Sequence, residues 1–191
     1  STSSNDNTIT GNTCNNNDNG IYLYLSSDDN TVIGNTCNNN NNGIRLYTSN
    51  NNTVTGNTCD NSYYGFLLDS SSNNIVTGNT CNNNDNGIHL IASSNNTITG
   101  NTCIRGTGTP GDYTTNQHTI VLAGTGNNYN LVVANNCMGK APVVQGGTGN
   151  TVLINKWDAS DDIQNISDYT YNPKTYIEAN YQPVIAFPTA G

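Results

Sequence analysis

The chain of 191 residues has a formal net charge of -8, and only 9% of its residues are charged, against roughly a quarter in an ordinary globular domain. Its five Lys and Arg residues are scattered, which argues against nucleic-acid binding, because that binding needs clustered cations to neutralise phosphates. The same scarcity argues against anionic membrane surfaces, and no apolar run approaches the roughly 20 residues of a membrane-spanning helix. Hydrophobic residues make up 33% of the chain, so it would be disordered unless a repeat built its core.

A repeat is present from the first residues onward. The segment "TITGNTCNN" at Thr8 recurs with small changes at Thr31, Thr53, Ile75 and Thr97, and the cysteines of these five copies are 23, 22, 22 and 22 residues apart. Three apolar columns keep the same step, with one residue in each repeat. They are Ile9, Val32, Val54, Val76, Ile98, Val132 and Val152; Ile21, Ile44, Phe66, Ile88 and Ile120; and Leu23, Leu46, Leu68, Leu90 and Leu122.

Each column marks a short strand, because apolar and polar residues alternate around it, as in Ile21-Tyr22-Leu23. No segment shows the spacing of an amphipathic helix. A single unit of about 22 residues cannot bury its apolar side alone, whereas stacked units cover one another. The sequence therefore predicts an all-β fold, a parallel β-helix of about seven coils in which each strand pairs with its equivalent in the next coil at about 4.8 Å.

The motif N-x-I-x-G-N-x-C-x-N, followed by G-I-x-L, resembles the repeat of the right-handed parallel β-helix family, which includes the NosD-like repeats of extracellular and archaeal surface proteins. The resemblance covers about residues 5–157, with Cys where the family usually has an aliphatic residue. It implies a right-handed coil and an extracellular or cell-surface location. It leaves the activity open, because proteins of this fold include enzymes, adhesins and structural proteins.

Asparagine recurs at three predicted corners of the coil. The corner sets are Asn12, Asn35, Asn57, Asn79, Asn101, Asn135 and Asn155; Asn16, Asn39, Asn61 and Asn83; and Asn30, Asn52, Asn74, Asn96, Asn130 and Asn150. An amide is both donor and acceptor, so stacked Asn side chains can bond to each other and to backbone groups that leave the strands. Stacked Asp would repel. Gly20, Gly43, Gly65 and Gly87, each before an inward residue, are expected to have positive φ.

The repeat changes after Cys103. An insertion at about 104–117 is expected to bulge from a corner, and the coil domain is expected to end at Trp157, in the cysteine column, where a large aromatic residue could close the core. Residues 158–191 lose the period, so they form either a cap or an arm that docks on a neighbour. The short apolar run Pro183, Val184, Ile185, Ala186 and Phe187 is the candidate docking segment.

The cysteines form a column of their own that should point into the core. The simplest interpretation is a stack of small buried thiols. Disulfides between adjacent coils are the alternative, because neighbouring strands fall within the ~4.4–6.8 Å Cα separation of a disulfide, and successive thiols along one column cannot surround a metal ion. The members are Cys14, Cys37, Cys59, Cys81, Cys103 and Cys137.

No catalytic site emerges from the sequence. Glycoside hydrolysis needs two carboxylates that face one sugar, but Asp69 is the only acid on the two outward columns of the longer strands, and "CNNNDNGI" lacks the acidic first ligand and the closing Glu of a calcium loop. We expect no cofactor and no enzymatic activity. A possible carbohydrate-binding or carbohydrate-processing surface consists of Tyr22, Tyr24, Arg45, Tyr47 and His89.

Outward threonines form a second surface pattern. Thr8 and Thr10, and their equivalents in later repeats, resemble the Thr-x-Thr array of β-helical ice-binding proteins, although Ile33 and Ile75 interrupt it, and Thr simply favours strands. The favoured function is structural: a self-associating building block of a sheath, surface layer, filament or adhesin stalk. The repeat begins at once near Ser1, so we expect the first coil to present a strand edge that upstream repeats or another copy would cover.

Overall fold

The computed structural model describes residues 3–104, 117–138 and 142–155, which form two parallel sheets. The seven-strand sheet consists of β1 (Thr8–Thr10), β3 (Thr31–Ile33), β5 (Thr53–Thr55), β7 (Ile75–Thr77), β9 (Thr97–Thr99), β11 (Leu131–Val133) and β13 (Thr151–Leu153). The six-strand sheet consists of β2 (Asn19–Tyr24), β4 (Asn42–Tyr47), β6 (Tyr64–Asp69), β8 (Asn86–Ile91), β10 (His118–Ala123) and β12 (Val143–Val144). The described residues contain no helix, and thus none long and apolar enough to cross a membrane.

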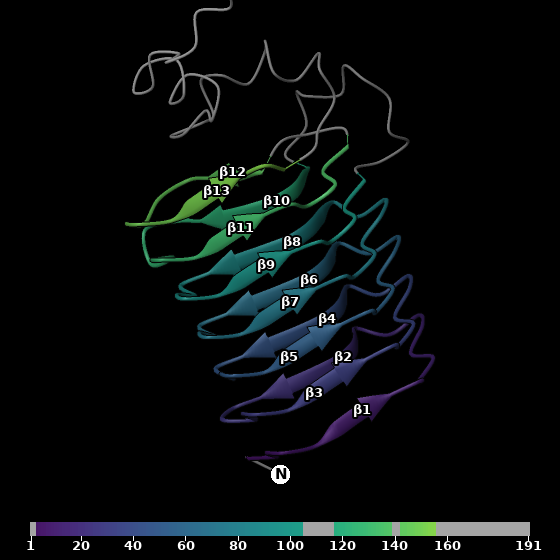
Figure 1. Ribbon diagram of the computed structural model, residues 1–191. Helices are drawn as coiled ribbons and strands as arrows, with labels where there is room; N and C mark the ends of the chain where they lie inside the picture. The colour runs from purple at the N-terminus through teal and green to yellow at the C-terminus, as the bar shows by residue number, and fades with distance from the viewer. Residues whose placement is uncertain (1–2, 105–116, 139–141, 156–191) are drawn as a thin grey trace, which may run out of the picture.

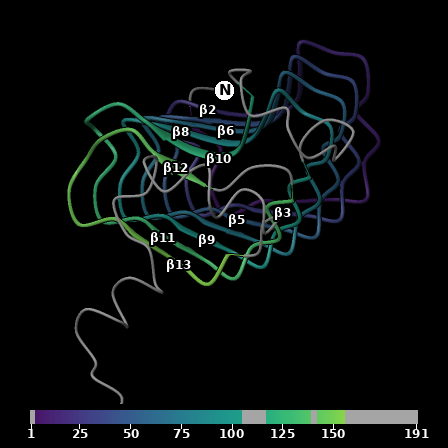
Figure 2. The ribbon, with the colours of Figure 1, turned by 90° about the horizontal axis from the view of Figure 1, so that it is seen from above.

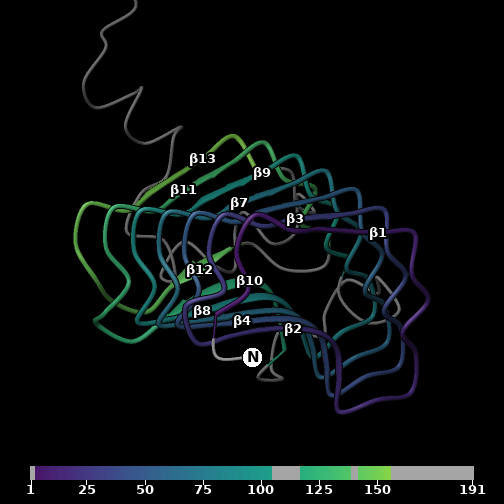
Figure 3. The same ribbon diagram turned by 90° about the horizontal axis from the view of Figure 1, so that it is seen from below.

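Every strand pairs in parallel with its equivalent in the next coil, so the chain winds through one sheet and then the other (Figure 1). The register superposes like on like: Ile9 pairs with Val32, and Ile21 pairs with Ile44. Figures 2 and 3, which look along the stack, show the two sheets on opposite sides of each coil. The predicted all-β parallel solenoid is therefore confirmed.

The core lies between the two sheets and consists of the three predicted aliphatic columns and the cysteines. Ile44, Leu46, Val54 and Phe66 have no exposed surface, and burial of a side chain of this size contributes about 1.5–3 kcal/mol. A strand of three residues places only its middle side chain inside, which is why one Val or Ile in each short strand is sufficient.

Two corners of the coil are held by the predicted Asn ladders. The backbone N–H and the Nδ2 of Asn57 both donate to the Oδ1 of Asn79, at 2.9 and 3.0 Å, and Asn79 donates in the same way to Asn101. The Asn57 Nδ2 also donates to the carbonyls of Val32 and Thr55. The ladder from Asn30 to Asn150 repeats this arrangement at another corner. Buried corner N–H groups are thereby satisfied.

Two further ladders lie at positions that sequence reasoning missed. One contains Ser27, Ser49, Ser71, Ser93 and Asn127, in which each backbone N–H donates to the side-chain oxygen of the next coil. The other contains Asn17, Asn40, Ser62 and Asn84. The predicted corner residues Asn16, Asn39, Asn61 and Asn83 precede this second ladder and have φ of 55–60°. Asn is among the residues that tolerate this left-handed conformation best.

In the part of the chain that the structure describes, aspartate occurs in ladders as a single member between neutral neighbours. Asp60 accepts from the backbone N–H of Asn82 at 2.6 Å, and its own N–H donates to Asn38. Asp28 accepts from the N–H of Asn50 at the same distance. Short bonds of this kind are typical of a charged acceptor, and the neutral neighbours avoid the repulsion that stacked carboxylates would produce.

The prediction of positive φ for Gly20, Gly43, Gly65 and Gly87 is wrong. Positive φ, between 62 and 66°, is found instead at the glycine of each Gly-Asn-Thr-Cys segment: Gly11, Gly34, Gly56, Gly78 and Gly100. Gly20, Gly43, Gly65 and Gly87 are glycine because atoms of the next coil lie too close to admit a side chain. A Cβ added to Gly43 would lie 2.5 Å from the Gly65 carbonyl oxygen and 2.7 Å from the Cys59 Cβ. The absent side chain makes room for the cysteine of the next coil.

Several predicted features lie outside the described residues. They are most of the insertion, Trp157, and the proposed docking tail with Pro183, Val184, Ile185 and Phe187. The described coil reaches Asn155, close to the predicted domain end at residue 157.

The two kinds of glycine should respond differently to the same substitution. Gly43→Ala should lower the free energy of unfolding by about 3 kcal/mol or more, because backbone atoms block the new Cβ. Gly56→Ala should lower it by about 1 kcal/mol, because a Cβ at Gly56 meets no atom within 4 Å and only the left-handed φ opposes it. Urea unfolding of both variants measures the difference, and equal losses would contradict the assignment.

Candidate ligand-binding face

The six-strand sheet presents two outward columns on the side away from the core. Alternation along each six-residue strand turns Ile21 and Leu23 inward and Tyr22 and Tyr24 outward. The register gives one column as Tyr22, Arg45, Leu67, His89 and Val121, and the other as Tyr24, Tyr47, Asp69, Ile91 and Ala123. Both columns agree with the order expected from the repeat.

Arg45 is the centre of the first cluster on this surface. Its guanidinium Cζ lies 5.1 Å from the ring centroid of Tyr22 and 5.3 Å from that of Tyr47, within the range of a cation–π contact. Its Nη2 donates to the Asp69 Oδ2 at 3.3 Å. Both charges are about a quarter exposed, so the pair is a partly screened contact that holds Arg45 between the two rings.

Three tyrosines form a continuous aromatic surface beside Arg45. The rings of Tyr24 and Tyr47 are stacked, with centroids 5.6 Å apart and an angle of 14° between their planes. Tyr22 lies 5.1 Å from Tyr24 at a tilt of 53°. Tyr22 and Tyr24 are 38% and 42% exposed. We call Tyr22, Tyr24, Arg45, Tyr47 and Asp69 the tyrosine–arginine face.

His89 belongs to a separate cluster, although the sequence grouped it with Arg45. Leu67, which is buried, lies between Arg45 and His89 in the column. The His89 ring packs edge-on against Tyr64 at 4.9 Å, and Tyr64 packs against Tyr63 at 4.6 Å. Burial lowers the pKa of His89 to about 4, and its Nδ1 is a buried atom without a hydrogen-bond partner. His89 is therefore a neutral, packed side chain at pH 7.

Sequence reasoning missed the ion pair and the two tyrosines beside His89. Asp69 follows Arg45 by 24 residues, one coil and two residues further on. That diagonal separation is within reach of a long side chain, so the period of 22 contained the signal. Tyr64 begins β6 in register with Asn42 and Asn86, and no repeat partner marks it as aromatic.

The six cysteines form the predicted inward column as free thiols. Cys37, Cys59, Cys81, Cys103 and Cys137 are buried, and the Sγ atoms of Cys81 and Cys103 lie 2.9 Å apart. Burial raises the pKa of Cys59, Cys81, Cys103 and Cys137, whereas a hydrogen bond from the Cys59 thiol lowers that of Cys37. Most of the column is thus protonated and sealed from solvent. Disulfide formation between coils stays a prediction.

The outward threonines of the seven-strand sheet stack in register. Thr8, Thr31 and Thr53 follow one another in one column, which then passes through Ile75 to Thr97. A second column contains Thr10, Ile33 and Thr55. Ile75 in the first column and Ile33 in the second are exposed. An uninterrupted third column of threonines follows the next bend, with Thr13, Thr36, Thr58, Thr80 and Thr102. Ice binding by this surface stays a prediction.

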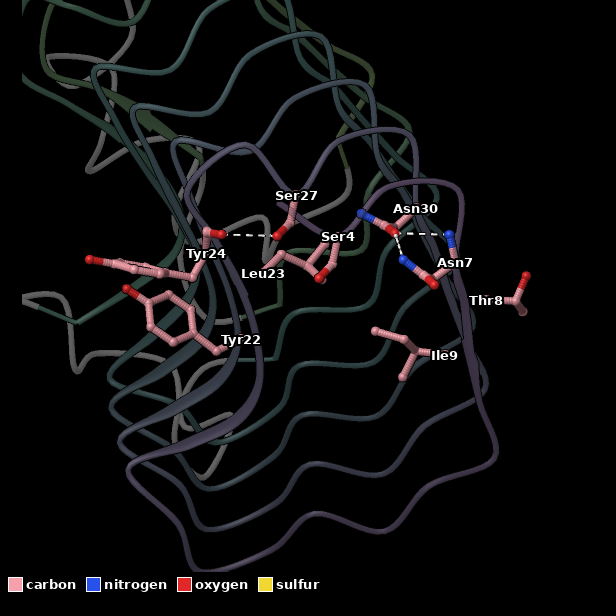
Figure 4. A pocket seen from close by; sticks show the side chains of 9 residues that line it. All are labelled: Ser4, Asn7, Thr8, Ile9, Tyr22, Leu23, Tyr24, Ser27 and Asn30. Carbon is pink, nitrogen blue, oxygen red and sulfur yellow. Dashed lines mark hydrogen bonds between the residues drawn. The ribbon is translucent and has the colours of Figure 1, made fainter. Parts of the chain in front are cut away.

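A cavity of about 520 Å³ opens at the face of the first coil (Figure 4). Ile9 and Leu23 form its apolar part, and Asn7, bonded to Asn30, forms part of its polar rim. Tyr22 and Tyr24 also line the cavity, so the tyrosine–arginine face adjoins it.

Removal of His89 should change how stability depends on pH. A folded pKa near 4, below the 6.5 of an unperturbed histidine, contributes stability that is complete above pH 6.5 and is lost as the pH falls toward 4. In His89→Leu, the decline of the urea-unfolding free energy between pH 6.5 and 4 should be shallower than in the wild type. An unchanged decline would show that His89 is not a buried neutral group.

Alkylation should separate Cys14 from the rest of the column. Cys14 is half-buried in the first coil, so iodoacetamide should modify it in the native protein, while the five buried thiols react only after unfolding. Mass spectrometry after denaturation without reductant counts the remaining thiols. A total of six free thiols supports the thiol column, and a loss in steps of two would show disulfides between coils.

The family whose description is "Periplasmic copper-binding protein (NosD)" matches residues 1–182 of the chain. No curated protein and no solved structure gives a significant match.

The described side chains form no cluster that suits the copper in that description. In the described ranges, no three His, Cys, Asp or Glu residues are placed to hold one metal ion. Thiolates suit Cu(I), but a ligand must lose its proton and a metal needs an entry path. Four thiols meet neither condition, because they are buried and have raised pKa values: Cys59, Cys81, Cys103 and Cys137. Cys14 and Cys37 alone are too few for the three-ligand group that is absent from the described residues. The cysteine column does not fit a copper site.

The family match covers nearly the whole chain, and the parallel β-helix agrees with the resemblance of its repeat motif. The chain belongs to the NosD family of periplasmic β-helix proteins.

Proposed function

We propose that the protein is a rigid structural element outside the cytoplasm, a building block of a sheath, surface layer, filament or stalk that stacks end to end with coils of its own kind. The observation that carries the proposal is the continuity of bonding between coils. Both sheets and the corner ladders join each coil to the next. Such a rod resists bending, and its natural means of extension is a further coil.

The face of the first coil carries the groups that a stacking partner would use. In the ladders that contain Asn30 and Asn35, the Oδ1 of each Asn accepts from the coil before it, as Asn35 does from Asn12, whereas Asn38 and Asn50 accept from the coil after them. Asn7 and Asn12 occupy these ladder positions in the first described coil, so their Oδ1 atoms are placed to accept from a coil that stacks against it. Strand β1 pairs on one side, with β3, and Ile9 and Leu23 line the end cavity. The complementary partner is a coil edge that offers N–H donors and an aliphatic column.

A non-enzymatic role is part of the proposal. Among the described residues, Asp69 is paired with Arg45, while Asp28 and Asp60 accept corner N–H groups. Carboxylates engaged in this way are not free to face one another across a substrate, as acid and base of a glycosidase must.

The stacking proposal predicts concentration-dependent association through the first coil. The 191-residue chain should form end-to-end oligomers in sedimentation and linear particles in electron microscopy. Added salt should favour them, because it screens repulsion between copies of net charge -8. Ile9→Lys, which places a charge at the end cavity, should weaken association at least 10-fold. Ile75→Lys, on the outward side of β7, is the matched control and should leave it unchanged.

Hydrogen exchange supplies an independent measurement. Amides of β1 should exchange faster in dilute solution than in concentrated solution, where a partner coil covers them. A monomer at every concentration, with β1 amides already protected, would contradict the proposal.

A further inference from the structure

We infer that the tyrosine–arginine face binds the chain of a neutral polysaccharide. The inference goes beyond the structural role proposed above, because it concerns the outward side of the six-strand sheet, although Tyr22 and Tyr24 also line the cavity of the first described coil. It rests on how exposed, how rigid and how nearly uncharged this cluster is.

The first observation is a group of exposed tyrosine rings that do not take part in the hydrophobic core. The fold buries its aliphatic columns on the opposite side of these strands, and aromatic residues are only 7% of the chain. Three of them nevertheless lie side by side on neighbouring strands β2 and β4, two of them about two-fifths exposed. Adjacent exposed rings on a rigid sheet are more typical of a contact surface than of a packing requirement.

The second observation is that the rings are held in place before any ligand arrives. Tyr24 stacks on Tyr47, and the Arg45 guanidinium contacts both Tyr22 and Tyr47 while it bonds to Asp69. Every residue of the cluster stands on a strand whose register is fixed by the coil. A preorganised surface loses little conformational entropy when it binds.

A saccharide has the chemistry that this surface complements. One side of a sugar ring presents C–H groups, which pack on an aromatic ring, and its edge carries hydroxyl groups. Tyrosine offers a flat apolar ring with a hydroxyl at its rim. The guanidinium of Arg45 offers several donors, and the carboxylate of Asp69 accepts. Apolar plane and polar edge therefore occur together on this face, as they do on a sugar.

Charge selects a neutral polysaccharide over an acidic one. The positive charge of Arg45 is already paired with Asp69 at 3.3 Å, so the cluster has no net positive charge. The whole chain carries -8, and its field repels polyanions. A uronate-rich or sulfated chain would meet repulsion, and no free cation among the described residues of this face would offset it.

The shape of the face selects a chain over a single sugar. The outward residues of a sheet contact only one side of a ligand, so one sugar ring loses little surface to the contact. Several linked units that lie across Tyr22, Tyr24 and Tyr47 add their contacts without a new loss of translational freedom.

Affinity electrophoresis of the 191-residue chain tests the inference. The gels contain neutral polysaccharides (hydroxyethyl cellulose, laminarin, mannan, xylan) or acidic ones (alginate, polygalacturonate). We expect retardation by at least one neutral polymer and none by the acidic ones. No retardation by any neutral polymer, or retardation by the acidic ones alone, would overturn the inference.

Variants locate the binding on the face. Tyr47→Ala should weaken binding to the retained polymer at least 5-fold, whereas Tyr47→Phe, which keeps the ring, should lose less than 3-fold. Tyr129→Ala removes another exposed tyrosine, 63% exposed and outside the cluster, and should bind like the wild type. Equal loss in Tyr47→Ala and Tyr129→Ala would overturn the assignment.

The charge argument has its own variant. The double variant Arg45→Gln with Asp69→Asn keeps hydrogen-bonding groups and removes both charges, so it should retain neutral-polymer binding within about 3-fold. Circular dichroism confirms that each variant is folded. Because association is measured separately by sedimentation, loss of saccharide binding and loss of stacking are distinguishable.

Discussion

At the corners of this solenoid, a side-chain carbonyl takes the place that a backbone carbonyl has in the strands, and the fold depends on that substitution. Where the chain turns, the N–H of Asn57 finds the Oδ1 of Asn79. A buried donor without a partner costs about 1–3 kcal/mol, and every coil repeats several such corners. With only 33% hydrophobic residues, the aliphatic columns alone could not offset those losses.

The same requirement explains the unusual composition. The ladders that contain Asn57 and Asn52 need a side chain that both donates and accepts a hydrogen bond. The side chain must also be uncharged, since each member lies directly above the next. Asn meets all three conditions, Ser meets them with a shorter reach, and Asp lacks the donor. Asp28 and Asp60 therefore occur singly, in ladders where only an acceptor is needed. The scarcity of charge follows from the stacking of identical positions.

The fold could be predicted from the periodicity of the sequence, because a period of 22 residues places each side chain over its equivalent in the next coil. The aliphatic, cysteine and outward columns could all be predicted in this way. Glycine, however, is required for two different structural reasons. Gly56 has a left-handed φ, and Gly43 leaves room for Cys59 in the next coil. The ladder of Ser27, Ser49, Ser71 and Ser93 could not be predicted from the sequence, because single serines are common in turns. The pair of Arg45 and Asp69 needed the diagonal reach of real side chains.

The outward face differs from the core in being free to vary, and its residues change along the rod. The first coils carry Tyr22, Tyr24 and Arg45, whereas the same columns later hold Ile91 and Val121. Tyr22 and Tyr24 also line the cavity at the first described coil, so the proposed stacking partner and a saccharide on the face would both contact these two residues. If binding at one place changes the affinity at the other, the change must be the same factor in both directions. Such a coupling would pass through Tyr22 and Tyr24 and would require no change of shape in the coils.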